Sequence, residues 1–535
     1  MSSSTPPARS QSTGAATYDS VPYPAASFPQ THPNRLAGIA TLFGVDSPLP
    51  SAARVLELGC ADGANLLPMA EALPGATFLG IDYSGKQIEA GRQMLAAAGL
   101  TNVELRHQNI LDFPLTEGTF DYIIVHGIFS WVPEPVREKI LAICSACLTD
   151  RGVAYISYNA LPGWNMRKSL RDMMLFHTAG LTDPAGRVRQ ARALLKFLSD
   201  SVPSERDAYG MLLKSELELI SKAADNYLLH DHMEEENTAF YFHQFSQRAA
   251  KHGLQYLGES SLSPMIAANF PERVSKTLGQ LGQIVAQEQY MDFVRNRMFR
   301  ATLLCKAGLA VHRNLTPERL RDCAFQSLFL PLTAPVDLTA GVALECKTPA
   351  GQQVSATDPF LKAAFSILLE ANASAVGFRD LLAAASAKAA AFVTTPAPQR
   401  ARIEEVTLAK NLLDLCSRGL LEVHREPVRC SRSIPAKPKI DAIVRLQART
   451  GRSLTNRIHQ QIPADGVARA VAVACDGTRS VDQVIEHLLS ETKSGRITVQ
   501  AEGRPVTDDQ QVRTILTGQI QSTLTAFARG GFFAA

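Results

Sequence analysis

The stretch RVLELGCADGANL, residues 54–66, carries the clearest structural signal in this chain. Residues 54–58 are mostly apolar and predict a short buried strand, and Gly59 and Gly63 bound the turn that follows. From Leu66 onward, apolar residues recur at helical spacing. A strand, a glycine turn and a helix N-terminus form a place that holds nucleotides, because backbone N–H groups there point at the ligand. The stretch therefore predicts a nucleotide-binding α/β domain.

Length and composition are those of an ordinary globular protein. The 535 residues suffice for roughly three to four domains. A net charge of +3 gives no global basic surface, so we expect no nucleic-acid partner. No apolar run approaches the roughly 18 residues that span a bilayer, and the N-terminus has no apolar signal segment, so we expect no membrane contact. Residues 1–17, rich in serine, proline and threonine, are expected to be disordered.

The cysteines and histidines do not indicate a metal site. Nine cysteines are scattered without paired spacing, which favours a reducing cytoplasm over a disulfide framework. The C-x-x-C pair, Cys144 and Cys147, continues the apolar face of a predicted helix, and no further ligands stand near it. His230, His232 and His243 lie in a helical pattern, where His230 and His232 do not share a face. We therefore expect a cytoplasmic protein that holds no metal.

Residues from about 54 to 158 alternate short apolar strands with helices, which indicates a buried parallel sheet. Residues from about 165 to 320 follow the helical period almost throughout. The expected strands are Arg54–Leu58, Thr77–Asp82, Val103–Asn109, Phe120–Val125 and Gly152–Tyr158.

The last third of the chain changes pattern. A predicted hairpin at 341–356 precedes several helices and a strand at 420–424, which suggests a winged-helix-like module. After a proline-rich linker, a last small domain contains Ser480 and Gln483, which predict a capping box. The resulting division is a disordered segment at 1–17, a nucleotide-binding domain at 18–170, a helical domain at 171–330, and winged-helix-like domains at 331–430 and 436–535.

A dinucleotide and S-adenosylmethionine compete as ligands of the glycine turn. A dinucleotide fold needs G-x-G-x-x-G after its first strand, and this chain lacks the second and third of those glycines. What remains is an acidic residue, Glu57, followed by Gly59 and Gly63. Asp82 ends the second strand, where a carboxylate accepts hydrogen bonds from the ribose hydroxyls of an adenosine. Asp82 alone also fits a nicotinamide cofactor.

Together these residues resemble motif I and its partners in the class I S-adenosylmethionine-dependent methyltransferases. In that family the acidic residue, here Glu57, faces the amino-acid part of the cofactor, and a middle glycine often stands where this chain has Ala61. An Asp that accepts from the adenine amino group commonly ends the third strand, where this chain has Asn109. The resemblance implies S-adenosyl-L-methionine as cofactor, bound by Glu57, Gly59, Gly63, Asp82, Asn109, Ile110 and His126.

Longer motifs narrow the resemblance to bacterial methyltransferases that carry a methyltransferase regulatory domain. LTNRIHQ and DGTR in the last domain resemble the C-terminal winged-helix region of rickettsial-type protein lysine methyltransferases. The implied fold is a Rossmann-like parallel-sheet domain, then an all-α regulatory domain and C-terminal winged-helix-like domains. The motifs in the first two domains are FDYIIVHGIFSWVP (120–133), YISYNALPGW (155–164), LLHDHMEEENTAFYFHQF (228–245) and EQYMDFVRNRMFR (288–300).

The resemblance also implies a division of labour. The first domain binds cofactor, the helical domain shapes the acceptor site, and the winged helices hold a protein partner. Winged helices often bind DNA, but the candidate recognition helix, GFRDLLAAASAKAA at 377–390, has one Arg and one Lys. A DNA reader needs several cations to neutralise phosphates. We therefore expect a protein acceptor, and a homodimer is left open.

Methyl transfer needs mainly orientation and exclusion of water. The carboxyl ends of strands four and five border the cofactor crevice and supply His126, Tyr158 and Asn159 as candidate catalytic residues. A lysine acceptor must lose a proton first, and His126 is the best placed polar group to assist. A hydrogen bond that shapes the adenine-side loop is an equally weighted role for His126.

The expected function is N-methylation of lysine in a protein. A small-molecule methyltransferase, whose C-terminal half serves dimerisation, and a binding scaffold that only senses the cofactor are the alternatives. Tyr18, Tyr23 and His32 precede the first strand, and in similar proteins such a segment folds over the cofactor.

Overall fold

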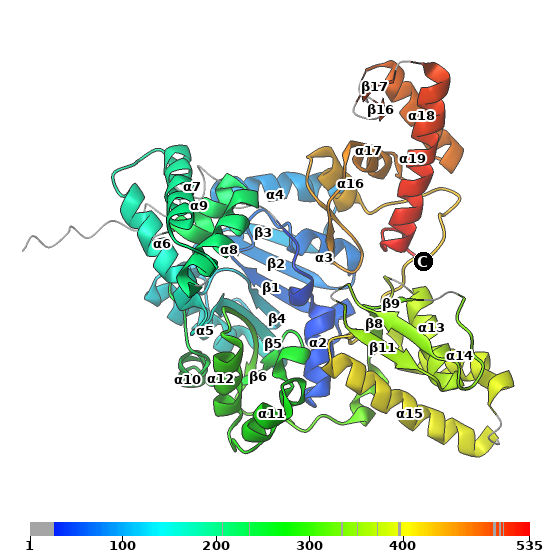
Figure 1. The fold of residues 1–535 in the computed structure, drawn as a ribbon, viewed down its shortest axis with the longest axis horizontal. Coiled ribbons are helices and arrows are strands. Elements are labelled where there is room, and N and C mark those ends of the chain that lie inside the picture. Colours follow the sequence, from blue (N-terminus) through cyan, green and yellow to red (C-terminus); the bar gives the residue numbers. More distant parts are fainter. Residues whose placement is uncertain are drawn as a thin grey trace, which may run out of the picture.

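The structure is a computed structural model, and it describes residues 26–535 except 206, 235, 333–334, 350, 372, 394–396, 496–498, 502–503 and 507. A central sheet is flanked by a helical lobe on one side and two smaller domains on the other (Figure 1). The predicted disordered segment 1–17, Tyr18 and Tyr23 lie outside the described residues.

The centre is a seven-stranded sheet in the order β3-β2-β1-β4-β5-β7-β6 (Figure 1). Its first five strands are parallel, whereas β7 pairs antiparallel with β5 and with β6. The strand order reverses between β1 and β4, so their carboxyl ends open a crevice at the switch point. The strands are β1 (Arg54–Leu58), β2 (Thr77–Asp82), β3 (Val103–His107), β4 (Phe120–Val125), β5 (Leu148–Asn159), β6 (Leu254–Glu259) and β7 (Phe299–Lys306).

The expectation of an all-helical region after the first domain was wrong in one respect. Strands β6 and β7 come from this region and extend the central sheet. Their short apolar runs do not distinguish strand from buried helix, and only the pairing of β7 with β5 and of β6 with β7 decides it. The helices around the sheet and in the lobe are α2 (Pro33–Leu42), α3 (Leu66–Ala72), α4 (Gly85–Ala98), α5 (Glu134–Cys147), α6 (Trp164–Thr178), α7 (Pro184–Ser201), α8 (Ala208–Lys222), α9 (Asp225–Met233), α10 (Phe242–Lys251), α11 (Glu272–Gly279) and α12 (Ile284–Arg295).

The sheet separates two hydrophobic cores. Successive strand residues face opposite sides, so Val55 of β1 and Tyr155 of β5 join the core that contains α2 and α3. Leu56, Ile156 and Tyr158 join the other core, beneath α5 and α10. This alternation decides which side chains at the strand ends share one face.

The middle module follows the predicted pattern. Strands β10 (Leu344–Lys347) and β11 (Gln353–Ala356) form the expected hairpin. Strand β8 (Ala324–Ser327), which precedes the predicted boundary at 330, pairs with β12 (Val376–Gly377) and β13 (Leu421–His424) of this module. Its helices are α13 (Pro359–Ala371), α14 (Phe378–Ala389) and α15 (Ala397–Ser417).

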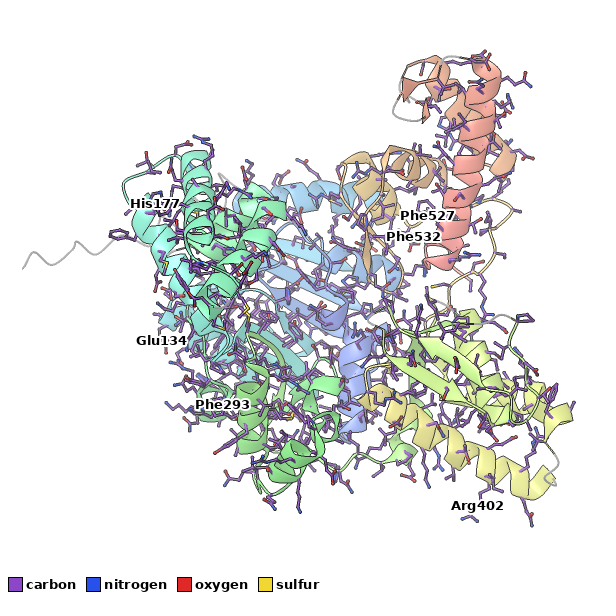
Figure 2. The ribbon with its side chains drawn as sticks, viewed as in Figure 1. Glu134, His177, Phe293, Arg402, Phe527 and Phe532 are labelled. Carbon is purple, nitrogen blue, oxygen red and sulfur yellow. The ribbon has the colours of Figure 1, made fainter. Side chains whose placement is uncertain are left out.

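The C-terminal domain returns to the first domain. Its helix α16 (Ala442–Arg449) contacts α3 and α4 beside the sheet (Figure 1). Phe527 and Phe532, whose rings lie 4.9 Å apart, belong to its core (Figure 2). Its other elements are β14 (Leu454–Thr455), β15 (Gln461–Ile462), α17 (Gly466–Ala474), α18 (Val481–Lys493), β16 (Gln500–Ala501), β17 (Arg504–Pro505) and α19 (Asp509–Arg529). Among the described residues, no helix combines the length and the apolarity that crossing a membrane requires.

Candidate active site

The turn after β1 adopts the backbone that its glycines allow. Gly59 and Gly63 have φ values of 75° and 76°, in the left-handed region that favours glycine. A Cβ at Gly59 would lie 2.4 Å from the Ile128 side chain, so a larger residue does not fit there. Ala61, at the position of the missing middle glycine, also has a positive φ of 52°. The turn therefore keeps a glycine-like path through an alanine.

Asp82 fastens this turn to the end of β2. Its Oδ2 accepts the N–H of Ala61 at 2.9 Å, and its Oδ1 accepts the N–H of Ser84 at 2.8 Å. Burial raises the pKa of Asp82, and backbone hydrogen bonds from Ser84, Ala61 and Tyr83 oppose that shift. Each carboxylate oxygen retains a lone pair, so Asp82 can still accept from hydroxyl groups of a ligand.

Glu57 is the buried carboxylate at the carboxyl end of β1. It is 3% exposed, and its Oε1 accepts from Asn65 Nδ2 at 2.7 Å. Its Oε2 is buried without a hydrogen-bond partner among the described residues. Burial raises the pKa of Glu57 to about 7, and the hydrogen bond from Asn65 acts in the opposite direction. An ammonium group placed against Oε2 would satisfy this oxygen and favour the charged carboxylate.

The loop after β3 presents Asn109 and Ile110 to the same edge of the sheet. The side chain of Asn109 caps the short helix η3 (Ile110–Asp112), because its Oδ1 accepts the N–H of Leu111 at 3.0 Å. Both Asn109 and Ile110 are partly exposed. An adenine amino group would share the Asn109 oxygen with the backbone.

His126 follows β4 and lies on the same face of the sheet as Glu57. Its Nδ1 is 2.9 Å from the Tyr155 hydroxyl, and 3.4 Å from Ser157 Oγ. The ring of Phe28 lies over it, with 3.9 Å between the ring centroids. Burial lowers the pKa of His126 to about 4, so the ring is neutral at pH 7.

The alternation along β5 separates Tyr158 from Asn159. Tyr158 is 1% exposed, stacks on Phe245 at 4.1 Å and forms a 3.2 Å hydrogen bond with Thr302 on the opposite face from His126. Burial raises the pKa of Tyr158 well above its ordinary value. Asn159 is also buried, but its Nδ2 has no partner within the described structure. The placement of Tyr158 argues against a catalytic role for it.

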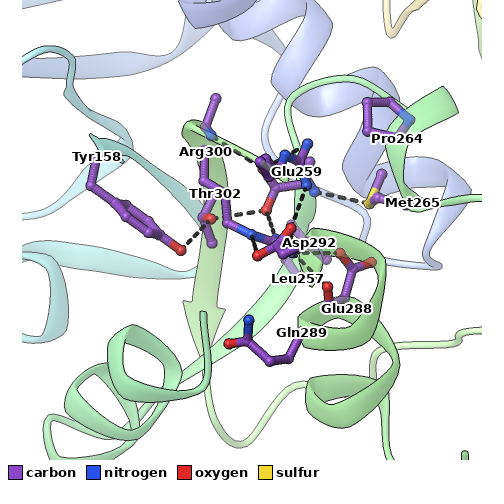
Figure 3. Close-up of polar contacts among 12 residues, drawn as sticks. Tyr158, Leu257, Glu259, Pro264, Met265, Glu288, Gln289, Asp292, Arg300 and Thr302 are labelled. Atoms are coloured by element: carbon purple, nitrogen blue, oxygen red, sulfur yellow. Dashed lines mark hydrogen bonds and ion pairs between the residues drawn. The ribbon is translucent and has the colours of Figure 1, made fainter. Parts of the chain in front are cut away.

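Behind Tyr158 lies a buried ionic cluster centred on Arg300 (Figure 3). The guanidinium contacts Glu259 at 2.6 Å, Glu288 at 3.0 Å and Asp292 at 2.9 Å. These residues come from β7, β6 and α12, so the cluster ties α12 to the last two strands of the sheet. Every partner is hydrogen-bonded, as a buried charge requires.

The segment before α2 covers the turn. The N–H of Phe28 donates to Asn65 Oδ1 at 2.9 Å, and the Thr31 hydroxyl accepts from Asn65 Nδ2 at 3.0 Å. His32 was expected, with Tyr18 and Tyr23, in a segment that folds over the cofactor. It is buried, and its Nδ1 accepts the N–H of Asn34 and so caps α2. It faces His459 of the C-terminal domain at 5.4 Å between ring centroids, rather than His126.

Sequence reasoning missed two residues that shape this site. Tyr155 shares the face of His126, and the period-two alternation of β5 would have indicated it. Asn65 precedes α3 and joins the turn to Glu57, but a single asparagine there has no distinctive pattern.

Among the described residues, no cluster of His, Cys, Asp and Glu is arranged to hold a metal. His232 instead contacts Glu216 at 2.7 Å inside the helical lobe.

Three family models match consecutive parts of the chain. They are described as "Methyltransferase domain" at residues 55–152, "Predicted methyltransferase regulatory domain" at 224–306, and "PKMT, C-terminal winged helix domain" at 436–532. The first match contains the turn, Asp82 and His126, and the last begins just before α16.

Individual relatives match much of the chain. The Rickettsia prowazekii protein RP789 is 36% identical over 505 residues, which are 93% of this chain and 90% of that protein. The R. prowazekii protein RP028 is 43% identical over 239 residues, covering 45% of this chain and 96% of that protein. The structure of PKMT2 from Rickettsia typhi in complex with AdoHcy has a TM-score of 0.85 and 32% identity, over 96% of this chain and 99% of that one.

Proposed function

The chain belongs to the S-adenosylmethionine-dependent methyltransferases that join a methyltransferase domain, a regulatory domain and a PKMT-type C-terminal winged-helix domain, and we propose that it N-methylates lysine side chains of a protein acceptor. The observation that supports the lysine and protein assignments is the similarity to R. typhi PKMT2, which extends over 96% of this chain. A match confined to the first domain would support neither lysine as the methylated residue nor a protein as the acceptor.

We assign the cofactor to the turn after β1. The orphaned Oε2 of Glu57 suits the ammonium of the amino-acid part, because a buried carboxylate oxygen needs a donor. Asp82 suits the ribose hydroxyls, and Asn109 with Ile110 suits the adenine. Gly59 and Gly63 place no side chain at either end of the turn. When bound, S-adenosylmethionine supplies an activated methyl group.

His126 and Asn159 are the chain's proposed contributions at the acceptor. A histidine with a pKa of about 4 is a weak base, so His126 serves better as a neutral hydrogen-bond partner held by Tyr155 than as the group that removes the lysine proton. The unpartnered Asn159 amide offers a second polar group on the same face. Both residues orient the acceptor nitrogen, and Phe28 excludes water from the side of the ring it covers.

The exposed aromatic side chain of Phe299 forms an apolar rim beside His126 and supports a protein acceptor over a small molecule. Phe299 is 43% exposed and its ring centroid lies 6.3 Å from that of His126. Exposed aromatic side chains near a polar site are typical of surfaces that bind proteins.

The decisive experiment supplies pure protein and cell lysate with methyl-labelled S-adenosylmethionine, followed by gel and mass analysis. Label on lysine in a protein band supports the proposal. Label in a small metabolite selects the small-molecule alternative, and no label above the Asp82→Ala control selects the cofactor-sensing scaffold.

A variant of the rim separates acceptor binding from cofactor binding. Phe299→Asp places a charge on this apolar surface and should lower methylation of the protein acceptor about tenfold or more, while the affinity for S-adenosylhomocysteine stays unchanged. The matched control is Phe392→Asp, because Phe392 is equally exposed (44%) but lies in the middle module. Equal rates in both variants would remove the rim from the acceptor site.

A further inference from the structure

The C-terminal domain makes a direct hydrogen bond to the cofactor turn. His459 Nε2 lies 2.8 Å from Asn65 Oδ1, and both side chains are buried. The same oxygen accepts the N–H of Phe28, so the orientation of the amide is fixed and His459 Nε2 must be the donor. The other end of the amide donates to Glu57 Oε1 at 2.7 Å. A chain of hydrogen bonds therefore runs from His459 through Asn65 to Glu57.

His459 is held in place by an unusual backbone. It is 2% exposed and lies in the turn between β14 and β15 with a positive φ of 65°. Its N–H donates to the carbonyl of Asn456 at 2.9 Å, which closes the turn. Burial lowers the pKa of His459 well below its ordinary value. A left-handed conformation at a non-glycine residue is strained and persists where the surroundings impose it.

Other contacts hold the C-terminal domain against the same turn. Arg452 forms an ion pair with Asp62 at 2.6 Å, inside the glycine turn itself. The carboxylate of Glu71, on α3, accepts the N–H of Ile443 at 2.9 Å and that of Ala442, at the start of α16. Docking therefore does not depend on His459 alone.

We propose that the C-terminal winged-helix domain is part of the cofactor site, in which His459 acts as a positioning residue that orients Glu57 through Asn65. The inference rests on the assignment of Glu57 to the ammonium of the cofactor. It adds a function that the family resemblance did not imply, since that resemblance gave the winged helices only a protein partner to hold.

The proposal predicts a selective loss of affinity. Without the donor from His459, Asn65 Oδ1 keeps only the N–H of Phe28 and the Thr31 hydroxyl, so the amide that donates to Glu57 Oε1 is held less firmly. S-adenosylhomocysteine, which carries the amino-acid part, should then bind about tenfold or more weakly, the effect of about one hydrogen bond to a charged group. 5′-Methylthioadenosine lacks the ammonium and carboxylate, so its affinity should change less than threefold.

The test measures both dissociation constants by calorimetry on the full-length chain. His459→Phe keeps a ring but has no donor, and His459→Ala is measured beside it in case one of them does not fold. His459→Gln restores an N–H donor and should recover most of the affinity for S-adenosylhomocysteine. Glu71→Gln is the matched control, because it weakens domain docking without touching the chain from His459 to Glu57. In Glu71→Gln, the ratio of the dissociation constants for S-adenosylhomocysteine and 5′-methylthioadenosine should equal the wild-type ratio.

Two results would overturn the proposal: unchanged affinity for S-adenosylhomocysteine in a folded His459 variant, or equal weakening of both ligands. Glu57→Gln separates failure of this inference from failure of the cofactor assignment. If Glu57→Gln keeps the wild-type ratio, the assignment of Glu57 is wrong. If Glu57→Gln loses the selectivity and His459→Phe does not, only the role of His459 is wrong.

Discussion

Replacing His424 with leucine should make the protein less sensitive to acid. His424 ends β13 and is 3% exposed. Helix α2 of the first domain packs closely against this strand, because a Cβ added to Gly38 of α2 would lie 2.8 Å from the Val423 carbonyl oxygen. Neither ring nitrogen has a hydrogen-bond partner among the described residues. Burial, followed by the nearby Arg35 and His32, lowers the pKa of His424 well below its ordinary value.

The magnitude follows from the unfolded state. The unfolded chain protonates this ring below a pKa of about 6.5, whereas the folded chain keeps it neutral, so stability falls as the pH falls. The loss from His424 is negligible at pH 7.5 and grows to about 1–2 kcal/mol between pH 5.5 and pH 5.0. Leucine cannot bind this proton. As the pH falls, the free energy of unfolding of His424→Leu should therefore decrease less than that of the wild type, by the amount that His424 contributes.

Urea unfolding, followed by circular dichroism at pH 7.5, 6.5 and 5.5, measures this difference. His177→Leu is the control, because His177 lies exposed on α6 in the helical lobe (Figure 2). A difference between wild type and His424→Leu that stays constant from pH 7.5 to 5.5 would refute the reasoning. So would an equal change in the control.

Three further predictions concern the site. Asp82→Ala removes the acceptor that fastens the turn and, by assignment, binds the ribose, so calorimetry should show affinity for S-adenosylmethionine at least ten- to a hundredfold weaker; unchanged affinity would place the ribose elsewhere. The pKa of His126 is about 4, so His126 stays neutral between pH 5.5 and 7.5. Any step in the pH profile of turnover within this range should therefore persist in His126→Phe, and a step that disappears in the variant would contradict the prediction. Tyr158→Phe loses one buried hydrogen bond and should cost about 1 kcal/mol of stability while turnover persists; a hundredfold loss of turnover would return Tyr158 to the catalytic group.

The sequence by itself determined the elements whose signals are local. The predicted bounds of β1, β2 and β4 agree with the structure, because each strand is a short apolar run ended by turn residues. The capping box at Ser480 and Gln483 is present with both of its hydrogen bonds. The motif-I glycines bound the turn that their spacing indicated, and both have positive φ values there. All of these depend on residues within a few positions of one another.

Only the tertiary structure decided what joins distant segments. Strand β7 exists because the edge of β5 offers it hydrogen bonds, and β6 because β7 then offers its own; the sequences of both strands carry no clear period. The contact between His459 and Asn65 spans 394 positions, and no local pattern in either segment encodes it. Such a contact depends on how two folded domains dock, which is set by the shapes and charges of whole surfaces rather than by neighbours along the chain.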